Sequence, residues 1–292
     1  MFLFLLLLVP CMDSVRPVLF APGQVASTGF YTLAPAFTPD GNTVCFFQGA
    51  QNGGDSLMIA TRRNGRWRTP QVAVFSGRYR DLEPAFSPDG RYLIFASSRP
   101  ERDGDTAVSG WYNGKVYPAS GGRLWRVTRN ADTWGTPEML PATVNANTSI
   151  FSPAVTGDGS LYYMRADSGK AFHIYRSAMK NGVLQPPAPM PFALPDHGDY
   201  DPVLSPDESY LIFSSGRAPA PHTADIFIVF RQGGGWSDPI DLRMALSADV
   251  HGTESRLSPD GKTLYFTKGP AADGTYGIWQ VDLSGLLRAH GL

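Results

Sequence analysis

The sequence predicts an all-β fold made of five similar units, because one short motif recurs along nearly the whole chain. Each copy is a Pro-Asp-Gly turn, or a close variant of it, between two short apolar runs. The turn aspartates are Asp40, Asp89, Asp158, Asp207 and Asp260, which lie 49, 69, 49 and 53 residues apart. A period near fifty residues, built from short strands and tight turns, is typical of a β-propeller, in which small sheets surround a central channel.

Each unit is expected to form one blade of four strands. In the second copy, residues 84–86 form a first strand and residues 91–97 a second. In the turn between them, Pro88 fixes φ, Asp89 bonds to nearby backbone and Gly90 accepts a positive φ. Further apolar runs at residues 124–127 and 138–140 supply the third and fourth strands.

The spacing also predicts how the ring closes. The fifth copy ends after a third strand at residues 277–281, so its fourth strand is missing. Residues 17–20 lie at about the position, relative to Asp40, that the fourth strands of the other copies occupy relative to the next aspartate. We therefore expect the N-terminal strand to complete the last blade, which gives five blades without open sheet edges. A sixth blade would have to lie in the 69-residue interval, but residues 101–122 are better interpreted as an elaborated loop.

Composition favours one domain over residues 15–292. The 292 residues carry a formal charge of −1, which gives no general attraction for nucleic acid or an anionic membrane. Cys45 falls within an apolar strand and is expected to be a buried free thiol, so no disulfide framework is predicted.

The first 14 residues form a separate, signal-like segment. Residues 1–9 are almost wholly apolar, but they are too few to span a bilayer as a helix. They resemble the apolar part of a secretory signal, although the basic residues that precede it are missing. The expected location is periplasmic or secreted, with no transmembrane span in the mature chain. Cys11 leaves a lipoprotein anchor as one alternative, and a misassigned start would leave the protein cytoplasmic.

The repeat unit at residues 84–97 resembles the PD40 (WD40-like) repeat of TolB-like propellers. The strand at residues 225–228 and the Trp-x-x-Pro that follows it fit the same pattern. The resemblance covers nearly the whole chain after residue 14. It implies a propeller that binds proteins in the bacterial envelope, although TolB-like propellers are typically six-bladed. Related repeats occur beside peptidase domains and in carbohydrate-active enzymes. The chain departs from TolB in lacking an additional N-terminal domain, and from the peptidases in leaving no room for a hydrolase domain.

Binding residues are expected where the loops of all blades converge. The loop that enters the first strand and the loop between the second and third strands share one face, which we call the loop face. Six residues before the turn aspartates stand Ala34, Glu83, Ser152, Asp201 and Glu254, of which three are acidic. Asp199 precedes Asp201 by two residues, and Arg99 and Arg217 each follow a turn aspartate by ten.

These charged groups have two interpretations. In the structural one, Glu83, Asp201 and Glu254 pair with the arginines or cap loop amides, because partly buried charges need partners. In the functional one, they form a polar funnel that grips a charged peptide, a sugar acid or a cation.

The densest polar cluster is residues 196–201, with three aspartates and His197. Its oxygen ligands would suit Ca²⁺, the one cofactor that the sequence suggests. His251 occupies nearly the same place in the next repeat, so the two imidazoles would face each other across neighbouring blades. Two histidines with carboxylates could form a metal site or an acid–base pair, and ordinary polar loop residues are the alternative.

No nucleophile elbow, phosphate-binding loop or His-Glu-x-x-His motif occurs, so no catalytic residue is assigned. The sequence favours a binding or scaffold module for a protein or glycan ligand. The alternative is a carbohydrate-active enzyme, of glycoside hydrolase or lyase type, with a histidine and carboxylate site at the channel mouth. The long loop of the second blade carries Trp111, Tyr112 and Tyr117, which we expect to contact a ligand.

Overall fold

The computed structural model describes residues 15–25, 30–50, 54–130, 133–167, 169–217, 225–269 and 276–292. The signal-like segment of residues 1–14 lies outside this part of the chain. No helix in the described ranges is long and apolar enough to cross a membrane.

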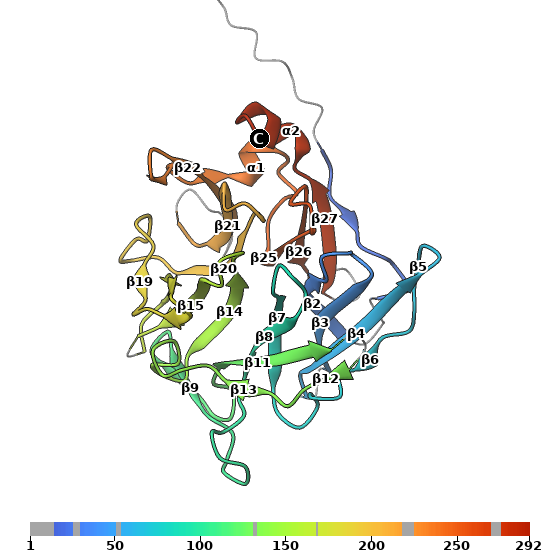
Figure 1. Cartoon of the computed structure of the whole chain (residues 1–292). Helices are drawn as coiled ribbons and strands as arrows, with labels where there is room; N and C mark the ends of the chain where they lie inside the picture. The colour runs from blue at the N-terminus through green and yellow to red at the C-terminus, as the bar shows by residue number, and fades with distance from the viewer. Residues whose placement is uncertain are drawn as a thin grey trace, which may run out of the picture.

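Five antiparallel sheets surround a central axis, as the sequence predicts (Figure 1). Blade one contains β2(Phe30–Phe37), β3(Thr43–Ala50), β4(Ser56–Arg63), β5(Arg66–Trp67) and β6(Gln71–Val72). Blade two contains β7(Asp81–Phe86), β8(Tyr92–Ser97), β11(Arg123–Asn130), β12(Thr133–Trp134) and β13(Glu138–Met139). Blade three contains β14(Ile150–Val155), β15(Leu161–Ala166), β16(Phe172–Ser177) and β19(Ala188–Pro189).

Blade four contains β20(Asp199–Leu204), β21(Tyr210–Ser215), β22(Asp225–Gln232), β23(Gly235–Trp236) and β24(Ile240–Asp241). Blade five contains β25(Thr253–Leu257), β26(Thr263–Lys268), β27(Gly277–Asp282) and β1(Val18–Leu19). Outside the blades lie the hairpins β9(Gly110–Tyr112)–β10(Lys115–Tyr117) and β17(Met179–Lys180)–β18(Val183–Leu184), and the helices α1(Leu242–Ala245) and α2(Ser284–Ala289).

The N-terminal strand closes the ring. Val18 lies opposite Gln280 and Leu19 opposite Trp279, so β1 is the outer strand of blade five (Figure 1). Each first strand contacts the first strands of both neighbouring blades, including β2 and β25 at the junction. The five-blade prediction is therefore confirmed, and residues 101–122 form a loop that carries the β9–β10 hairpin.

The repeated aspartates build turns. Asp89 accepts hydrogen bonds from Ser87 Oγ at 2.7 Å and from the Arg91 amide at 3.0 Å. The bond from Ser87 is the largest cause that lowers the pKa of this carboxyl. Asp40, Asp158 and Asp260 form the same pair of bonds in their own turns. These turns lie at the opposite end of the strands from the loop face, and we call that end the turn face.

Apolar side chains fill the space within and between the blades. The second strands supply large, fully buried aromatic residues: Phe46, Phe95, Tyr163, Phe213 and Phe266. Cys45 is a buried free thiol, as predicted, and burial raises its pKa. At the ring junction, Phe20 makes edge contacts with Phe37 and Trp67 of blade one and Tyr265 of blade five.

We expect Phe20→Ala to lower the free energy of unfolding by about 3 kcal/mol, because it removes a buried aromatic ring that joins the first and last blades. Val18→Ala is the matched control, since Val18 is 55% exposed in the same segment. It should change stability by no more than about 0.5 kcal/mol. Urea denaturation measures both. Equal effects of the two variants would show that the closure does not depend on Phe20.

Candidate functional site

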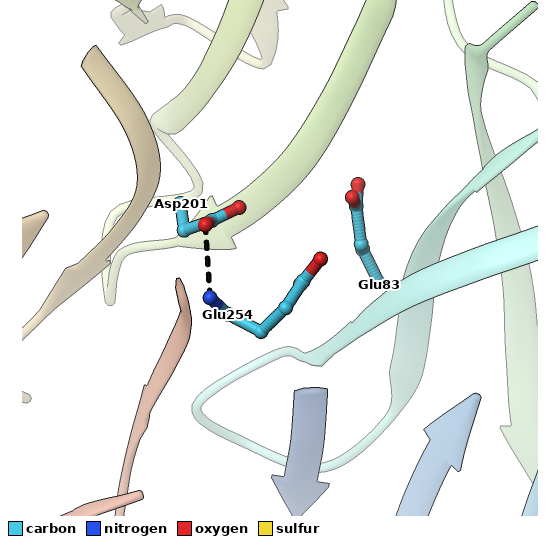
Figure 2. A group of neighbouring side chains, drawn as sticks. All are labelled: Glu83, Asp201 and Glu254. Carbon is cyan, nitrogen blue, oxygen red and sulfur yellow. Dashed lines mark hydrogen bonds between the residues drawn. The ribbon is translucent and has the colours of Figure 1, made fainter. Parts of the chain in front are cut away.

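Each first strand contains one residue in the left-handed backbone conformation. These are the residues six positions before the turn aspartates, with φ of 51° at Ala34, 52° at Glu83, 46° at Ser152, 52° at Asp201 and 57° at Glu254. The strand pairing shifts register at the same place in every blade. Such a bulge redirects a side chain. Here it brings three carboxylates together from three blades (Figure 2).

Glu83, Asp201 and Glu254 form what we call the central carboxylate cluster. One carboxylate oxygen from each lies within 4.8 Å of the other two. Glu83 is 5% exposed and Asp201 3% exposed, whereas Glu254 is half-buried. The sequence placed these three residues near the channel, and the structure brings them into direct proximity. Their ability to bind a ligand stays a prediction.

Hydrogen bonds between blades hold the cluster. The Ser152 amide donates to Glu83 Oε2 at 2.6 Å, and Ser152 Oγ donates to Asp201 Oδ1 at 2.8 Å. The Glu254 amide donates to Asp201 Oδ2 at 2.8 Å (Figure 2). Glu254 Oε2 is buried and has no hydrogen-bond partner among the described residues. These bonds link blades two to five and leave that oxygen as an open acceptor.

Burial and mutual repulsion make the glutamates weak acids. Burial raises the pKa of Glu83 to about 7, and the charge of Asp201 adds to this effect. Burial also raises the pKa of Glu254 well above its ordinary value, with Asp201 and Glu83 contributing. Arg256 and Arg80 oppose both shifts. The two glutamates therefore hold their protons to a higher pH than ordinary carboxyl groups do.

Arg256 lies beside the cluster, and sequence reasoning missed it. The equivalent residues of the other blades are small and apolar: Ala36, Ala85, Ala154 and Val203. Arg256 is 4% exposed, and its Nη1 donates to the Ser255 carbonyl at 2.7 Å. Its Nε and Nη2 are buried without a partner among the described residues. A charged residue at a repeat position that otherwise holds small apolar residues was the sequence signal that could have identified Arg256.

A cavity of about 170 Å³ lies on the turn-face side of the cluster. All five first strands and the turns after them line it, mostly with apolar residues and prolines such as Pro35, Pro153 and Pro202. Arg256 is the single ionisable residue in this lining. The channel is therefore apolar at its turn-face end and acidic in its interior.

Arg99 and Arg217 form clamps within their own blades. Arg99 Nη2 lies 2.9 Å from Asp81 Oδ1, and Arg99 Nε donates to Ser97 Oγ at 2.9 Å. In blade four, Arg217 Nη2 lies 2.7 Å from Asp199 Oδ1, and its Nε donates to Ser215 Oγ at 3.0 Å. Both aspartates are fully buried. The arginines thus pair with Asp81 and Asp199, not with the central carboxylate cluster.

The polar residues 196–201 are divided among different surroundings. Asp196 is exposed, Asp199 belongs to a clamp and Asp201 belongs to the cluster. His197 lies in the loop before β20, and His251 lies just before β25, where it forms an isolated β-bridge with Asp225. The three carboxylates of this segment therefore do not make one site. The structure instead joins Asp201 with Glu83 and Glu254.

The loop face carries a polar cleft of about 340 Å³ between blades one and two. Its lining includes Tyr31, Asp55, Arg78, Tyr79 and Arg80. Asp55 accepts from the Tyr31 hydroxyl at 2.8 Å and pairs with Arg80 Nε at 2.5 Å. Burial and Asp55 raise the pKa of Tyr31 to about 12, so its hydroxyl remains a neutral donor. We call this region the loop-face cleft.

No family model matches the chain. No curated protein matches it in sequence either. Solved structures resemble it in fold. TolB from Acinetobacter baumannii is 16% identical with a TM-score of 0.54, over 88% of this chain and 56% of that one. A thermostable family-43 glycoside hydrolase is 13% identical with a TM-score of 0.58, over 88% and 90%. A protein of unknown function from Dyadobacter fermentans is 14% identical with a TM-score of 0.52, over 94% and 99%. At these identities the likeness is one of fold.

We expect the metal-free protein to lose stability as pH rises, relative to Glu83→Gln. Folding raises the pKa of Glu83 from the ordinary value of 4.5 to about 7, so the protonated carboxyl stabilises the folded protein at low pH. This stabilisation is lost as the pH rises through that range, and it corresponds to roughly 3 kcal/mol of unfolding free energy. Thermal unfolding of both proteins in EDTA at pH 5 and pH 8 tests this. A stability difference between the two proteins that is the same at pH 5 and at pH 8 would contradict it.

Removal of a clamp arginine should destabilise the fold strongly. Arg99→Ala leaves the buried Asp81 without its cation, at a cost of about 3–5 kcal/mol. Arg126→Ala is the control, because the Arg126–Glu138 pair is exposed and its loss should cost less than about 1 kcal/mol. Chemical denaturation compares the two. Similar losses would mean that the clamp adds nothing beyond a surface ion pair.

Proposed function

We propose that this propeller is a binding module that docks an extended protein segment on its loop face. The observation that carries the proposal is the loop-face cleft, which presents preorganised polar groups in a concave surface. Asp55 fixes both the Tyr31 hydroxyl and Arg80, so these groups lose little conformational freedom when a ligand binds. The resemblance to TolB-like propellers supports a protein ligand and a periplasmic or secreted location.

The surroundings of the cleft also suit recognition. Arg78 has 66% of its side chain exposed and pairs with Asp103, which is itself largely exposed. The guanidinium of Arg99 lies 5.8 Å from the ring centre of Tyr79, so the clamp supports the floor of the cleft. On the same face, Trp111 of the β9–β10 hairpin is 52% exposed. Arginine, tyrosine and tryptophan are the residues enriched at the energetic centres of protein interfaces.

Glycoside hydrolysis is the second candidate, because a glycoside hydrolase shares this fold and three carboxylates converge in the channel. The size of the adjoining cavity favours it less, because about 170 Å³ is smaller than the ~300–1,000 Å³ typical of ligand sites.

A binding experiment with matched variants tests the proposal. Immobilised protein is exposed to a bacterial envelope extract, captured proteins are identified, and each is purified for a direct affinity measurement. We expect Arg78→Ala and Tyr79→Ala to weaken the affinity at least about tenfold. Lys262→Ala, an exposed substitution on the turn face, should leave it unchanged.

The same variants separate the alternatives. Equal binding by wild type, Arg78→Ala and Tyr79→Ala would refute docking at the loop-face cleft. Retention of polysaccharides or uronic-acid oligomers in place of proteins would assign the cleft to a glycan. Hydrolysis or lyase cleavage of those oligomers, lost in Glu83→Gln, would favour the enzyme.

A further inference from the structure

We propose that the cavity at the turn-face end of the channel binds a small carboxylate with an apolar tail, and that Arg256 holds its carboxylate group. We call this cavity, which the five first strands and the turns after them line, the turn-face cavity. The proposal does not depend on the function proposed for the loop-face cleft.

The proposal starts from the side chain of Arg256, which is buried and has unused donors. Arg256 is 4% exposed, and it belongs to the lining of the turn-face cavity. Its Nη1 donates to the Ser255 carbonyl, but its Nε and Nη2 have no partner among the described residues. The ion pairs in this part of the chain do not include Arg256. Buried charged donors without acceptors are costly, so a ligand that supplies acceptors gains this energy.

The two unused nitrogens lie on one edge of the guanidinium. Nε–H and Nη2–H are parallel there and match the two oxygens of a single carboxylate. Arg243 forms this pair of bonds elsewhere in the protein, because its Nε donates to Asp241 Oδ1 at 3.3 Å and its Nη2 to Oδ2 at 2.7 Å. Arg217, the other buried arginine of the described residues, uses the same edge on two side chains of its own blade. Arg256 therefore offers the fork that arginine uses to bind carboxylates.

The rest of the lining favours a ligand with one charge and an apolar body. Arg256 is the single ionisable residue in this lining, which otherwise consists mostly of apolar side chains and prolines. Proline has no N–H to donate, and the lining serines Ser87, Ser205 and Ser258 already bond within their own turns. A phosphate or sulfate would need further donors for its remaining oxygens. A monocarboxylate needs only the fork of Arg256, and its tail can pack on the apolar walls.

The volume of the cavity sets the size of the ligand. At about 30 Å³ for each water-sized group, about 170 Å³ holds roughly six non-hydrogen atoms. Butyrate, a carboxylate on a three-carbon tail, matches this size. The space exists because the residues equivalent to Arg256 in the other blades are small: Ala36, Ala85, Ala154 and Val203. The ring of first strands therefore supplies one cation and four small apolar residues at the same level.

The central carboxylate cluster opposes an anion, but two features weaken this opposition. None of its side chains belongs to the lining of the turn-face cavity. Burial also raises the pKa of Glu83 to about 7 and that of Glu254 above its ordinary value, so the cluster carries less negative charge than three free carboxylates would. In addition, the fold has already removed Arg256 from water, so only the ligand must lose its hydration on binding.

NMR titration with sodium butyrate at pH 6 tests the site. We expect the methyl signals of Ala36, Ala85 and Ala154, which line the cavity, to shift on binding with a dissociation constant of about 1 mM or tighter. Butyramide has nearly the same shape but no charge, and acetate lacks most of the tail. Each should bind at least about tenfold more weakly than butyrate.

Substitutions separate the charge, the fork and the space. Arg256→Lys keeps the charge without the fork and should bind butyrate at least about tenfold more weakly, and Arg256→Met should not bind it. Arg126→Met, at an exposed arginine of blade two, is the matched control and should bind as wild type. Ala85→Leu fills the cavity while Arg256 remains, so it should also weaken binding. Circular dichroism shows whether each variant is folded, and Ala85→Leu tests the site independently of the Arg256 variants.

Three results would overturn the proposal. They are no shift of the alanine methyl signals in wild type at tens of millimolar butyrate, equal binding of butyramide, and undiminished binding by folded Arg256→Met. A tripeptide with a free C-terminal carboxylate that binds where butyrate does not would also overturn it, since the site would then take a chain terminus. Each of these outcomes leaves docking at the loop-face cleft untouched, because that cleft shares no residue with the turn-face cavity.

Discussion

The structure depends on one left-handed residue in the innermost strand of every blade. In that conformation a residue with a side chain costs about 1–2 kcal/mol, so five of them make a substantial local penalty. Hydrogen bonds between the strained positions offset it. Ser152 donates to both Glu83 and Asp201, and the Glu254 amide donates to Asp201. The bulges therefore position the channel side chains and also bond neighbouring blades together.

The same geometry explains why the two faces of the ring differ. On the turn face, the Pro-Asp-Gly motifs complete their own hydrogen bonds and leave a small, mostly apolar cavity. On the loop face, the blades end in longer segments that bear tyrosines, arginines and an exposed tryptophan. Strand polarity sorts regular turns to one end and variable loops to the other. The proposed binding function lies at the variable end, and the charged centre is buried between the two faces.

The sequence predicted the fold well because its signals are local. Turn chemistry and strand length repeat at a fixed period, and the position of Pro17 relative to Asp40 indicated the closure that β1 forms with β27. The acidic residues at Glu83, Asp201 and Glu254 were also found by their place in the repeat. Their mutual distance could not be predicted, because it depends on the radius of the ring and on the bulges.

The pairing of the arginines was the harder inference. Arg99 and Arg217 follow Asp81 and Asp199 by 18 residues in each blade, so the clamp left a repeated signal. Sequence reasoning grouped those arginines with the channel acids, because the spacing of residues along the chain does not reveal which side chains are buried or where they point. The same limit applies to residues 196–201, where neighbours in sequence lie in three different environments.

The central claim is that the channel holds three carboxylates close enough to prevent their common ionisation. A carboxyl ¹³C NMR titration of Glu83 in metal-free protein measures this most directly. The account predicts an apparent pKa of about 7 for Glu83. A titration at the ordinary value of about 4.5 would contradict it.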